Sequence, residues 1–154
     1  MSIWWSLHLR RDAASVPLAR RLLLGTMETA GVDPEISYDL SVALSEACAN
    51  AVEHGGGAAR DHTSEAFRVT AYLDGEKCRI EVADAGPGVP AASSGRSRPP
   101  IRPAHSDAEN GRGLCLIEEL ADHVQFGSPQ GRGGAVVSFE KILKWRNDAP
   151  LVAV

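Results

Sequence analysis

Asp84 closes an apolar segment, and two glycines, Gly86 and Gly88, follow it in the stretch DAGPG. A carboxylate in this position can accept a hydrogen bond from an exocyclic amine, and glycines let the backbone pass close to a planar ligand. The motif therefore suits a small planar ligand that carries an amino group. Taken alone, it is equally typical of an ordinary turn.

A second pair of glycines, Gly111 and Gly113, stands in NGRGLCLIEELAD, immediately before a predicted helix. The exposed N–H groups and the dipole at the start of a helix favour phosphate. The motif thus predicts a phosphate-binding helix start. A flexible entry to a helix explains G-x-G-L alone just as well.

A polar stripe completes the set of candidate residues. In SEACANAVEHG, Glu46, Asn50 and His54 stand at intervals of four. On a helix, Asp39, Glu46, Asn50 and Glu53 fall in one narrow sector that borders the apolar face. Taken alone, the stripe is typical of solvated residues on an amphipathic helix. His54 ends this helix, where a histidine commonly bonds the last carbonyl groups.

The three motifs in this order, with a long loop between the second and the third, resemble a known family. EACANAVEHG resembles the N box of the GHKL ATP-binding fold shared by gyrase, MutL and histidine kinases, and DAGPG and GRGL resemble its two glycine boxes. The single-domain layout is similar to that of the bacterial anti-sigma-factor serine/threonine kinases. The resemblance covers roughly Ile3 to Leu143.

The resemblance implies a role for each matching residue. Asn50 would bind a Mg²⁺ ion that also bridges the phosphates of ATP, and Glu46 would be the base that draws the proton from an attacking hydroxyl. Asp84 would bind the amino group of adenine. Five further positions would complete the pocket: Gly86 and Gly88 beside the adenine, and Gly111, Gly113 and the backbone of Leu114 around the phosphates.

The resemblance also identifies a loop over residues 89–110 as the ATP lid. Its arginines, Arg96, Arg98 and Arg102, could approach the triphosphate, but a solvated basic loop is the commoner explanation of such residues. Ala135 stands where the family usually has a threonine that helps hold adenine. The lost hydroxyl contact is expected to cost about 1 kcal/mol, roughly fivefold in affinity.

Hydrophobic periodicity predicts the elements that carry these motifs. A strand follows from the alternation of Ile3 to Arg10, in which Trp4 and Trp5 cannot both face the core. Glycine and proline signals bound the helices, and Asp74-Gly75 indicates a hairpin. The expected elements are a strand over 3–10, helices over 15–30 and 34–54, two strands around Asp74-Gly75, a helix over 113–122, and a closing hairpin across PQGRG.

The order β-α-α-β-β-loop-α-β-β predicts an α+β fold, a two-layer sandwich of the GHKL type in which helices cover one face of a mostly antiparallel sheet. The chain of 154 residues is the size of one domain. We expect a single ATP-binding kinase domain over 1–145 and a tail over 146–154.

Composition narrows the function classes. The chain is 44% hydrophobic and 23% charged, with a formal charge of −4, which gives no general attraction to nucleic acid. No apolar run approaches the roughly 20 residues of a membrane helix, and MSIWWSLHLRRD is too quickly charged for a signal peptide. The three cysteines form no C-x-x-C pair and lie in apolar segments. These features favour a cytoplasmic protein without a membrane or nucleic-acid partner.

The functional hypothesis is a kinase that phosphorylates a serine or threonine of an anti-anti-sigma factor and sequesters a sigma factor, with ATP and Mg²⁺ as cofactors. The alternative is an ATP-dependent protein-binding module with little or no turnover. Arg20 and Arg21 on the first helix suit an acidic partner and equally a solvated helix face. The family likeness suggests a homodimer, although the sequence carries no visible interface signature.

Overall fold

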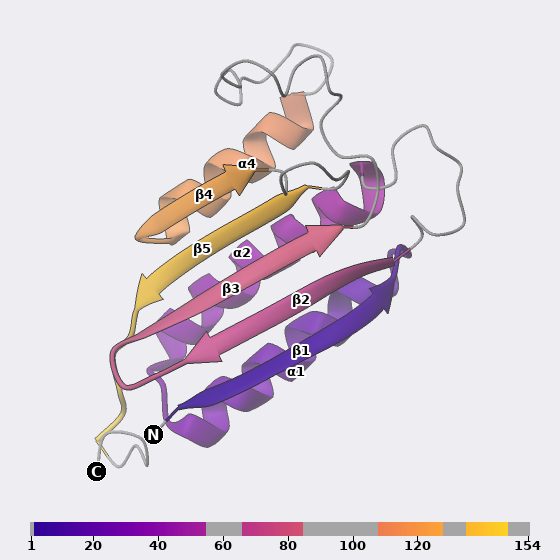
Figure 1. Cartoon of the computed structure of the whole chain (residues 1–154). Coiled ribbons are helices and arrows are strands. Elements are labelled where there is room, and N and C mark those ends of the chain that lie inside the picture. Colours follow the sequence, from indigo (N-terminus) through magenta and orange to yellow (C-terminus); the bar gives the residue numbers. More distant parts are fainter. Residues whose placement is uncertain (1, 55–65, 85–107, 128–134, 148–154) are drawn as a thin grey trace.

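The structure is a computed structural model that describes residues 2–54, 66–84, 108–127 and 135–147. Within these ranges the chain forms strands and helices in the predicted order (Figure 1). The elements are β1 (Ile3–Arg10), α1 (Ser15–Ala30), α2 (Pro34–His54), β2 (Ala66–Leu73), β3 (Lys77–Asp84), α4 (Ala108–Leu120), β4 (His123–Gly127) and β5 (Val136–Ile142).

The described strands form one sheet in the order β1-β2-β3-β5-β4, and every neighbouring pair is antiparallel. The helices lie on one face of this sheet (Figure 1). The predicted α+β sandwich is therefore confirmed. The insertion of β5 between β3 and β4 places the last strand at the centre of the C-terminal half of the sheet.

Three residues within the stretch 31–34 determine the connection between α1 and α2. Gly31 ends α1 in the left-handed region at φ 92°, and its N–H group bonds the carbonyl oxygens of Met27 and Glu28. The carboxylate of Asp33 then accepts the backbone N–H of Glu35 at 2.8 Å, while Pro34 occupies the first position of α2. These are the start and stop signals that the sequence predicts.

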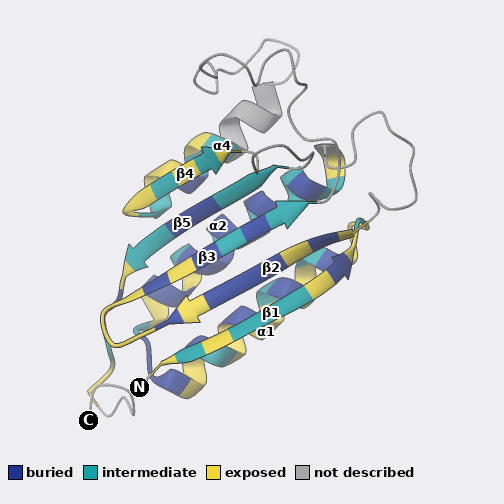
Figure 2. Ribbon diagram, viewed as in Figure 1, coloured by how far each residue is buried: buried dark blue, intermediate teal, exposed yellow. Residues whose placement is uncertain are grey.

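The core lies between the sheet and the helices (Figure 2). The predicted apolar face of α2 is confirmed, since its residues are all at least 93% buried: Ile36, Leu40, Ala43, Leu44, Ala47 and Ala51. Phe67 on β2, Ile80 on β3 and Phe139 on β5 pack in the same cluster. The long helix α2 is thereby fixed across the middle of the sheet.

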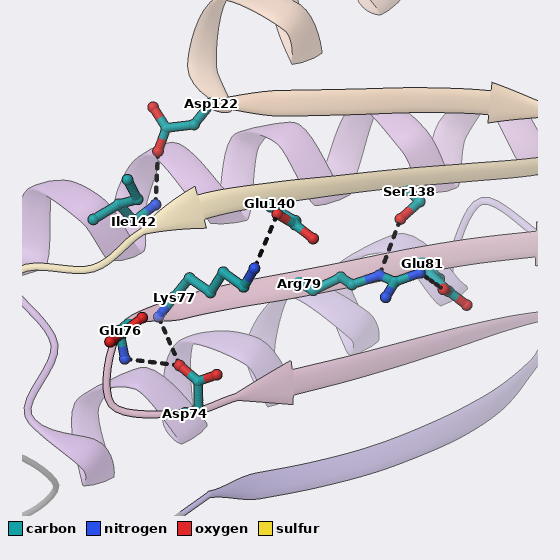
Figure 3. Close-up of polar contacts among 9 residues, drawn as sticks. All are labelled: Asp74, Glu76, Lys77, Arg79, Glu81, Asp122, Ser138, Glu140 and Ile142. Carbon is teal, nitrogen blue, oxygen red and sulfur yellow. Dashed lines mark hydrogen bonds and ion pairs between the residues drawn. The ribbon is translucent and has the colours of Figure 1, made fainter.

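The hairpin between β2 and β3 forms at Asp74-Gly75 as predicted. The Asp74 carboxylate accepts the backbone N–H groups of Glu76 at 2.7 Å and Lys77 at 2.8 Å, and the Asp74 N–H donates to the Lys77 carbonyl (Figure 3). These bonds hold the pKa of Asp74 below its usual value. The turn sets the register in which Leu73 pairs with Cys78.

The two adjacent tryptophans of β1 face opposite sides of the sheet. Trp5 points toward the helices, where its indole N–H donates to the hydroxyl of Thr26 at 3.0 Å. Trp4 lies on the open face, 60% exposed, with its ring centroid 6.3 Å from that of Tyr72. Strand alternation thus places one of them at the core, as expected.

One predicted boundary is wrong. The sequence predicts a helix over 113–122, whereas α4 begins at Ala108 and ends at Leu120. Glycine disfavours a helix interior by about 1 kcal/mol, which led to the late start. Ala108 and Glu109 are good helix formers, and Gly111 and Gly113 lie within the first two turns. The predicted PQGRG turn lies outside the described residues.

The chain returns after β5 to the start of α2. Val32 and Trp145 form an isolated antiparallel bridge, and the Arg146 N–H donates to the carbonyl of Gly31 at 2.8 Å. The Arg146 guanidinium also donates to the carbonyl of Glu28 at 3.2 Å. Residues 148–154 lie outside the described part of the chain.

Candidate functional site

Two of the sequence motifs meet at one end of the sheet. β3 ends at Asp84, and α2, which packs against β3, ends at His54; both run toward the same end of the molecule (Figure 1). Glu46 and Asn50 lie on the part of α2 nearest this end. The fold therefore brings together a carboxylate from the second motif and the polar stripe, although 34 residues separate Asn50 from Asp84.

The polar stripe of α2 lies between buried and exposed surface. Asp39, Glu46 and Asn50 are half-buried, whereas Glu53 is exposed. Asp39 faces the neighbouring elements, because its carboxylate lies 3.9 Å from the ammonium group of Lys141 on β5. The same ammonium group donates to the carbonyl of Leu120, the last residue of α4, at 2.7 Å.

The two contacts of Lys141 indicate how α2 and α4 are aligned along their lengths. It joins the C-terminal end of α4 to Asp39, and α4 runs antiparallel to α2 (Figure 1). From Leu120 back to Gly111 is about 14 Å of helix, and from Asp39 to Asn50 is about 17 Å. The start of α4, with Gly111, therefore lies level with Asn50, and the motif that is predicted to bind phosphate reaches the same end as the other two.

Asn50 carries an unusual atom at this end. Its Nδ2 is buried without a hydrogen-bond partner, the one such side-chain nitrogen or oxygen among the described residues. An unpaired buried polar group costs about 1–3 kcal/mol. The two ends of a carboxamide are told apart only by their partners, so the unpaired end is equally an available oxygen acceptor. Such a group fits a site that a ligand completes.

Asp84 is held by a neighbour that the sequence places far away. Its backbone N–H donates to the carbonyl of Ala135 at 3.0 Å, just before β5. Ala135, the residue that departs from the threonine pattern, is thus beside the carboxylate assigned to adenine. The Asp84 side chain is half-buried at this position.

A comparison with family models decides what this arrangement belongs to. The model of the histidine kinase-like ATPase domain matches residues 9–141. The chain belongs to the histidine kinase-like ATPase family. The match includes both the α2 stripe and the start of α4, and it makes a nucleotide the ligand expected at this end.

Individual members of the family resemble the chain over most of its length. The serine-protein kinase RsbW of Bacillus licheniformis is 33% identical over 133 residues, 83% of this chain and 78% of that protein. The anti-sigma F factor of Clostridium acetobutylicum is 26% identical over 113 residues, 71% of this chain and 75% of that protein. Each alignment therefore spans more than two thirds of both proteins.

A solved structure agrees in fold. The chain matches the RsbU and RsbW domains of a Mycobacterium tuberculosis protein with a TM-score of 0.61 and 22% identity. The match covers 91% of this chain and 33% of that chain, so this chain spans about a third of that structure. The likeness supports the family fold from β1 onward.

The remaining predicted residues of the family site fall into two groups. Leu114 is half-buried and packs against the core from α4, and Gly111 and Gly113 lie in the first two turns of that helix. The predicted positions Gly86 and Gly88, most of the lid at 89–107 and its arginines lie outside the described residues. The side chain of His54 is also outside the described part. Their assigned roles stay predictions.

The structure adds contacts that the motifs do not reveal. Arg20 of α1 is half-buried and donates to the hydroxyl of Ser45 at 3.0 Å, next to Glu46, and Arg11 donates to the carbonyl of Val52 at 3.1 Å. Both arginines tie α1 or its entry to α2. No local pattern predicts these bonds, because more than twenty residues separate each pair.

A buried thiol on α2 is chemically silent. Burial raises the pKa of Cys48 to about 12, so the thiol stays protonated near neutral pH. Burial, with a smaller contribution from the charge of Asp74, raises the pKa of Cys78 likewise to about 12. Neither cysteine is a nucleophile for the site.

In the described ranges no helix is long and apolar enough to cross a membrane.

A hollow on the described surface lies at the opposite end of β3. It has a volume of about 530 Å³ and lies beside Glu76, Lys77, Asp122, His123, Glu140 and Ile142. Its polar groups are engaged with one another, as in the 3.5 Å contact of Lys77 with Glu140. This hollow contains none of the residues that the family motifs single out.

Proposed function

We propose that this protein is an anti-sigma-factor-type serine/threonine kinase that binds ATP at the end of α2 and transfers its γ-phosphoryl group to a protein. The observation that supports the proposal is the Asn50 carboxamide, whose Nδ2 end is buried and unpaired, one helical turn from Glu46. On one helix face, an amide oxygen can bind the metal ion that accompanies the phosphates, and a carboxylate can accept a proton from the attacking hydroxyl.

Each residue has a separate task in this proposal. The Asn50 amide oxygen would bind Mg²⁺, which when bound to ATP neutralises phosphate charge. Glu46 would accept the proton of the substrate hydroxyl; its half-buried position on α2 would help to orient it. The Asp84 carboxylate would accept a hydrogen bond from the adenine amino group.

The backbone would hold the rest of the nucleotide. The first four N–H groups of α4, those of residues 108–111, have no partner within the helix and would bind phosphate together with the helix dipole. Gly113 and Leu114 would shape the wall behind them. Gly86 and Gly88 would border the adenine ring, where a side chain would obstruct a planar ligand.

The names of the relatives suggest the partners. Relatives of this chain are a serine-protein kinase and an anti-sigma F factor. We therefore propose an anti-anti-sigma factor as the phosphorylation substrate and a sigma factor as the protein that is sequestered. With these partners the protein would regulate transcription in the cytoplasm without binding nucleic acid itself.

The kinase step is tested by Glu46→Gln. The variant keeps the size and polarity of the side chain but removes the base, so we expect ATP binding to be unchanged and phosphoryl transfer to fall by about 10²–10⁴-fold. The assay is transfer from γ-labelled ATP to purified anti-anti-sigma proteins encoded beside the gene. Glu35→Gln, at the opposite end of α2, is the matched control and is expected to retain full transfer.

Two results would contradict the proposal. Equal transfer by Glu46→Gln and wild type would remove Glu46 from the catalytic role. Tight ATP binding with no transfer to any candidate would leave the protein-binding module as the function. The presence of Glu46 beside Asn50 disfavours that alternative, since binding alone does not require a base.

A further inference from the structure

The face of the sheet opposite the helices carries a strip of side chains along β1 and β2. Trp5, Leu9 and Phe67 pack toward the helices, so the alternate residues of these strands lie on the open face. From the hairpin end onward, the opposed pairs of this β1–β2 strip are Trp4 with Tyr72, Ser6 with Thr70, His8 with Arg68, and Arg10 with Ala66. The strip is accessible to another molecule, since no described helix covers this face (Figure 1).

One end of the β1–β2 strip is aromatic. Trp4 is 60% exposed, and its ring centroid lies 6.3 Å from that of Tyr72, which is 40% exposed. The Arg79 guanidinium of β3 lies over the Tyr72 ring, 6.0 Å from its centroid. Tryptophan and tyrosine are enriched where proteins bind one another, because a large ring buries much apolar area with few rotatable bonds. Trp4 therefore provides an apolar contact point at this end.

The other end of the β1–β2 strip is basic. His8, Arg10 and Arg68 are exposed, and His8 stands directly opposite Arg68. In the part of the chain that the structure describes, neither arginine forms an ion pair. Arg10 is diagonally across from Arg68, within reach of a long side chain, and like charges at such positions repel. A partner that brings negative charge would relieve this repulsion.

The acidic residues nearby are already engaged. On the open face, Glu81 and Glu140 each contact a basic residue of β3, at 2.7 Å and 3.5 Å. Asp12, close to Arg10 in the sequence, accepts the backbone N–H of Ala14 at 2.9 Å. The β1–β2 strip itself includes no aspartate or glutamate. The strip is thus positive at one end, although the whole chain has a formal charge of −4.

We propose that the β1–β2 strip binds an acidic, extended segment of another protein, whose apolar side chain packs on Trp4 and whose carboxylates bind Arg68 and Arg10. Arginine binds a carboxylate through two parallel N–H bonds, which makes it selective for this group. A strand rises by about 3.3 Å per residue, so Arg68, opposite His8, lies about 13 Å along the sheet from Trp4, and Arg10 about 20 Å. An extended segment has the same rise. Its carboxylates should therefore stand four and six residues from its apolar residue.

A single-stranded nucleic acid fits the β1–β2 strip less well. Nucleic acids bind through several phosphates at once, about 6–10 in complexes with duplex DNA, whereas the strip has two permanently charged side chains, Arg10 and Arg68. Bases stack on open ring faces, and one face of Tyr72 is already occupied by Arg79. These observations favour the carboxylates of a peptide.

The probe is a fluorescent synthetic peptide with phenylalanine at its first position, glutamate at its fifth and seventh positions, and serine elsewhere. We expect it to bind the full chain without nucleotide with a dissociation constant of about 100 μM, measured by fluorescence anisotropy at low salt. The control for the spacing is a peptide of the same composition with glutamate at its second and third positions. This control should bind about fivefold more weakly, because its carboxylates cannot reach the arginines.

Substitutions on the strip test each contact. Arg68→Gln and Arg10→Gln should each weaken binding of the first peptide about fivefold, and Trp4→Ala about tenfold, because each removes one contact with it. Two matched controls should leave the dissociation constant unchanged. Lys144→Gln removes an exposed charge outside the strip, and Ile142→Ala removes a 63% exposed side chain on β5. All five side chains are exposed, so the variants are expected to fold like wild type.

Four results would overturn the proposal. The first is the absence of saturable binding by wild type up to about 1 mM peptide. The second is equal binding of the two peptides, and the third is binding that Arg68→Gln and Trp4→Ala leave unchanged. The fourth is tighter binding of oligothymidylate than of the acidic peptide, which would make the partner a nucleic acid. The strip includes none of the residues assigned to ATP, so none of these results bears on the kinase proposal.

Discussion

The two ends of the sheet treat their polar groups differently. At the hairpin end, Asp74 binds two backbone N–H groups, Lys77 contacts Glu140, and the Asp122 carboxylate accepts the N–H of Ile142 at 2.6 Å (Figure 3). At the other end, Asn50 keeps a buried amide atom without a partner. The polar groups at the hairpin end bond to one another or to the backbone, whereas the α2 end contains a buried amide nitrogen without a hydrogen-bond partner.

The difference teaches where to look for function in this molecule. The hairpin end has a hollow of about 530 Å³, yet Lys77 and Glu140 beside it contact each other. The α2 end has an atom whose burial is unfavourable without a ligand. An unsatisfied buried group is therefore a better indicator of the site here than the size of a depression.

Removing the Asn50 carboxamide should have the largest effect, on ATP binding. We expect Asn50→Ala to weaken Mg²⁺-dependent ATP binding by about a hundredfold or more, because a metal ligand is lost. The free energy of unfolding should change by less than about 1 kcal/mol, since the variant also removes an unpaired buried amide. Calorimetric titration with and without Mg²⁺ measures the first, and urea unfolding the second.

The opposite result for Asn50→Ala, a loss of stability without a loss of ATP binding, would contradict this contrast between the two ends of the sheet. Intact binding together with a loss of about 3 kcal/mol in stability would make Asn50 a structural residue. Asp84→Ala is the companion variant, for which we expect loss of ATP binding both with and without Mg²⁺.

Lys141 should have the next largest effect, on stability alone. Lys141→Met keeps the apolar stem but removes the bonds to the Leu120 carbonyl and the Asp39 carboxylate. We expect the free energy of unfolding to fall by about 1–2 kcal/mol, measured by urea unfolding. Lys144→Met, at an exposed position two residues after the end of β5, should have almost no effect.

Asp74 should contribute a smaller, pH-dependent effect. Its folded pKa is lowered, so its stabilising contribution is present above the unfolded pKa of about 3.9 and is lost as the pH falls through the folded pKa. Asp74→Ala should therefore reduce stability by about 1 kcal/mol at pH 7 and progressively less below pH 4. Thermal unfolding from pH 7 to pH 2.5 measures the difference, and a gap that stays constant across this range would contradict it.

The exposed pair on the open face should matter least. Arg79 and Glu81 are joined at 2.7 Å, but their side chains are 45% and 27% exposed. Solvent-exposed ion pairs contribute little, so Arg79→Gln should change the free energy of unfolding by less than about 0.5 kcal/mol. The Arg79 guanidinium also lies 6.0 Å from the centroid of the Tyr72 ring. Arg68→Gln on the neighbouring strand provides the reference, and a clearly larger loss for Arg79→Gln would show that this ring contact matters.

The sequence predicts what depends on local chemistry. Gly31, Pro34 and Asp74-Gly75 bound their elements as expected, because caps and turns are determined by a few adjacent residues. The predicted start of α4 is too late, because Gly111 and Gly113 disfavour a helix locally although Ala108 and Glu109 begin one.

The rest depends on contacts between distant residues. The central place of β5, the bond of Lys141 to Leu120 and the burial of Asn50 follow from packing that periodicity does not describe. The candidate site illustrates the division: resemblance to the family identifies Asn50, and only the fold reveals that its amide is enclosed and unpaired.

The bonds of Trp145 and Arg146 to the α1–α2 connection have a consequence for synthesis. Arg146 reaches Glu28 across 118 residues of chain, so this closure joins segments that leave the ribosome at widely separated times. A ribosome releases about 5–20 residues per second, and the α1–α2 connection therefore waits at least several seconds for its partner. Until then a nascent chain exposes the surface around Val32, so residues 145 and 146, which are made long after α1 and α2, complete the packing around the α1–α2 connection.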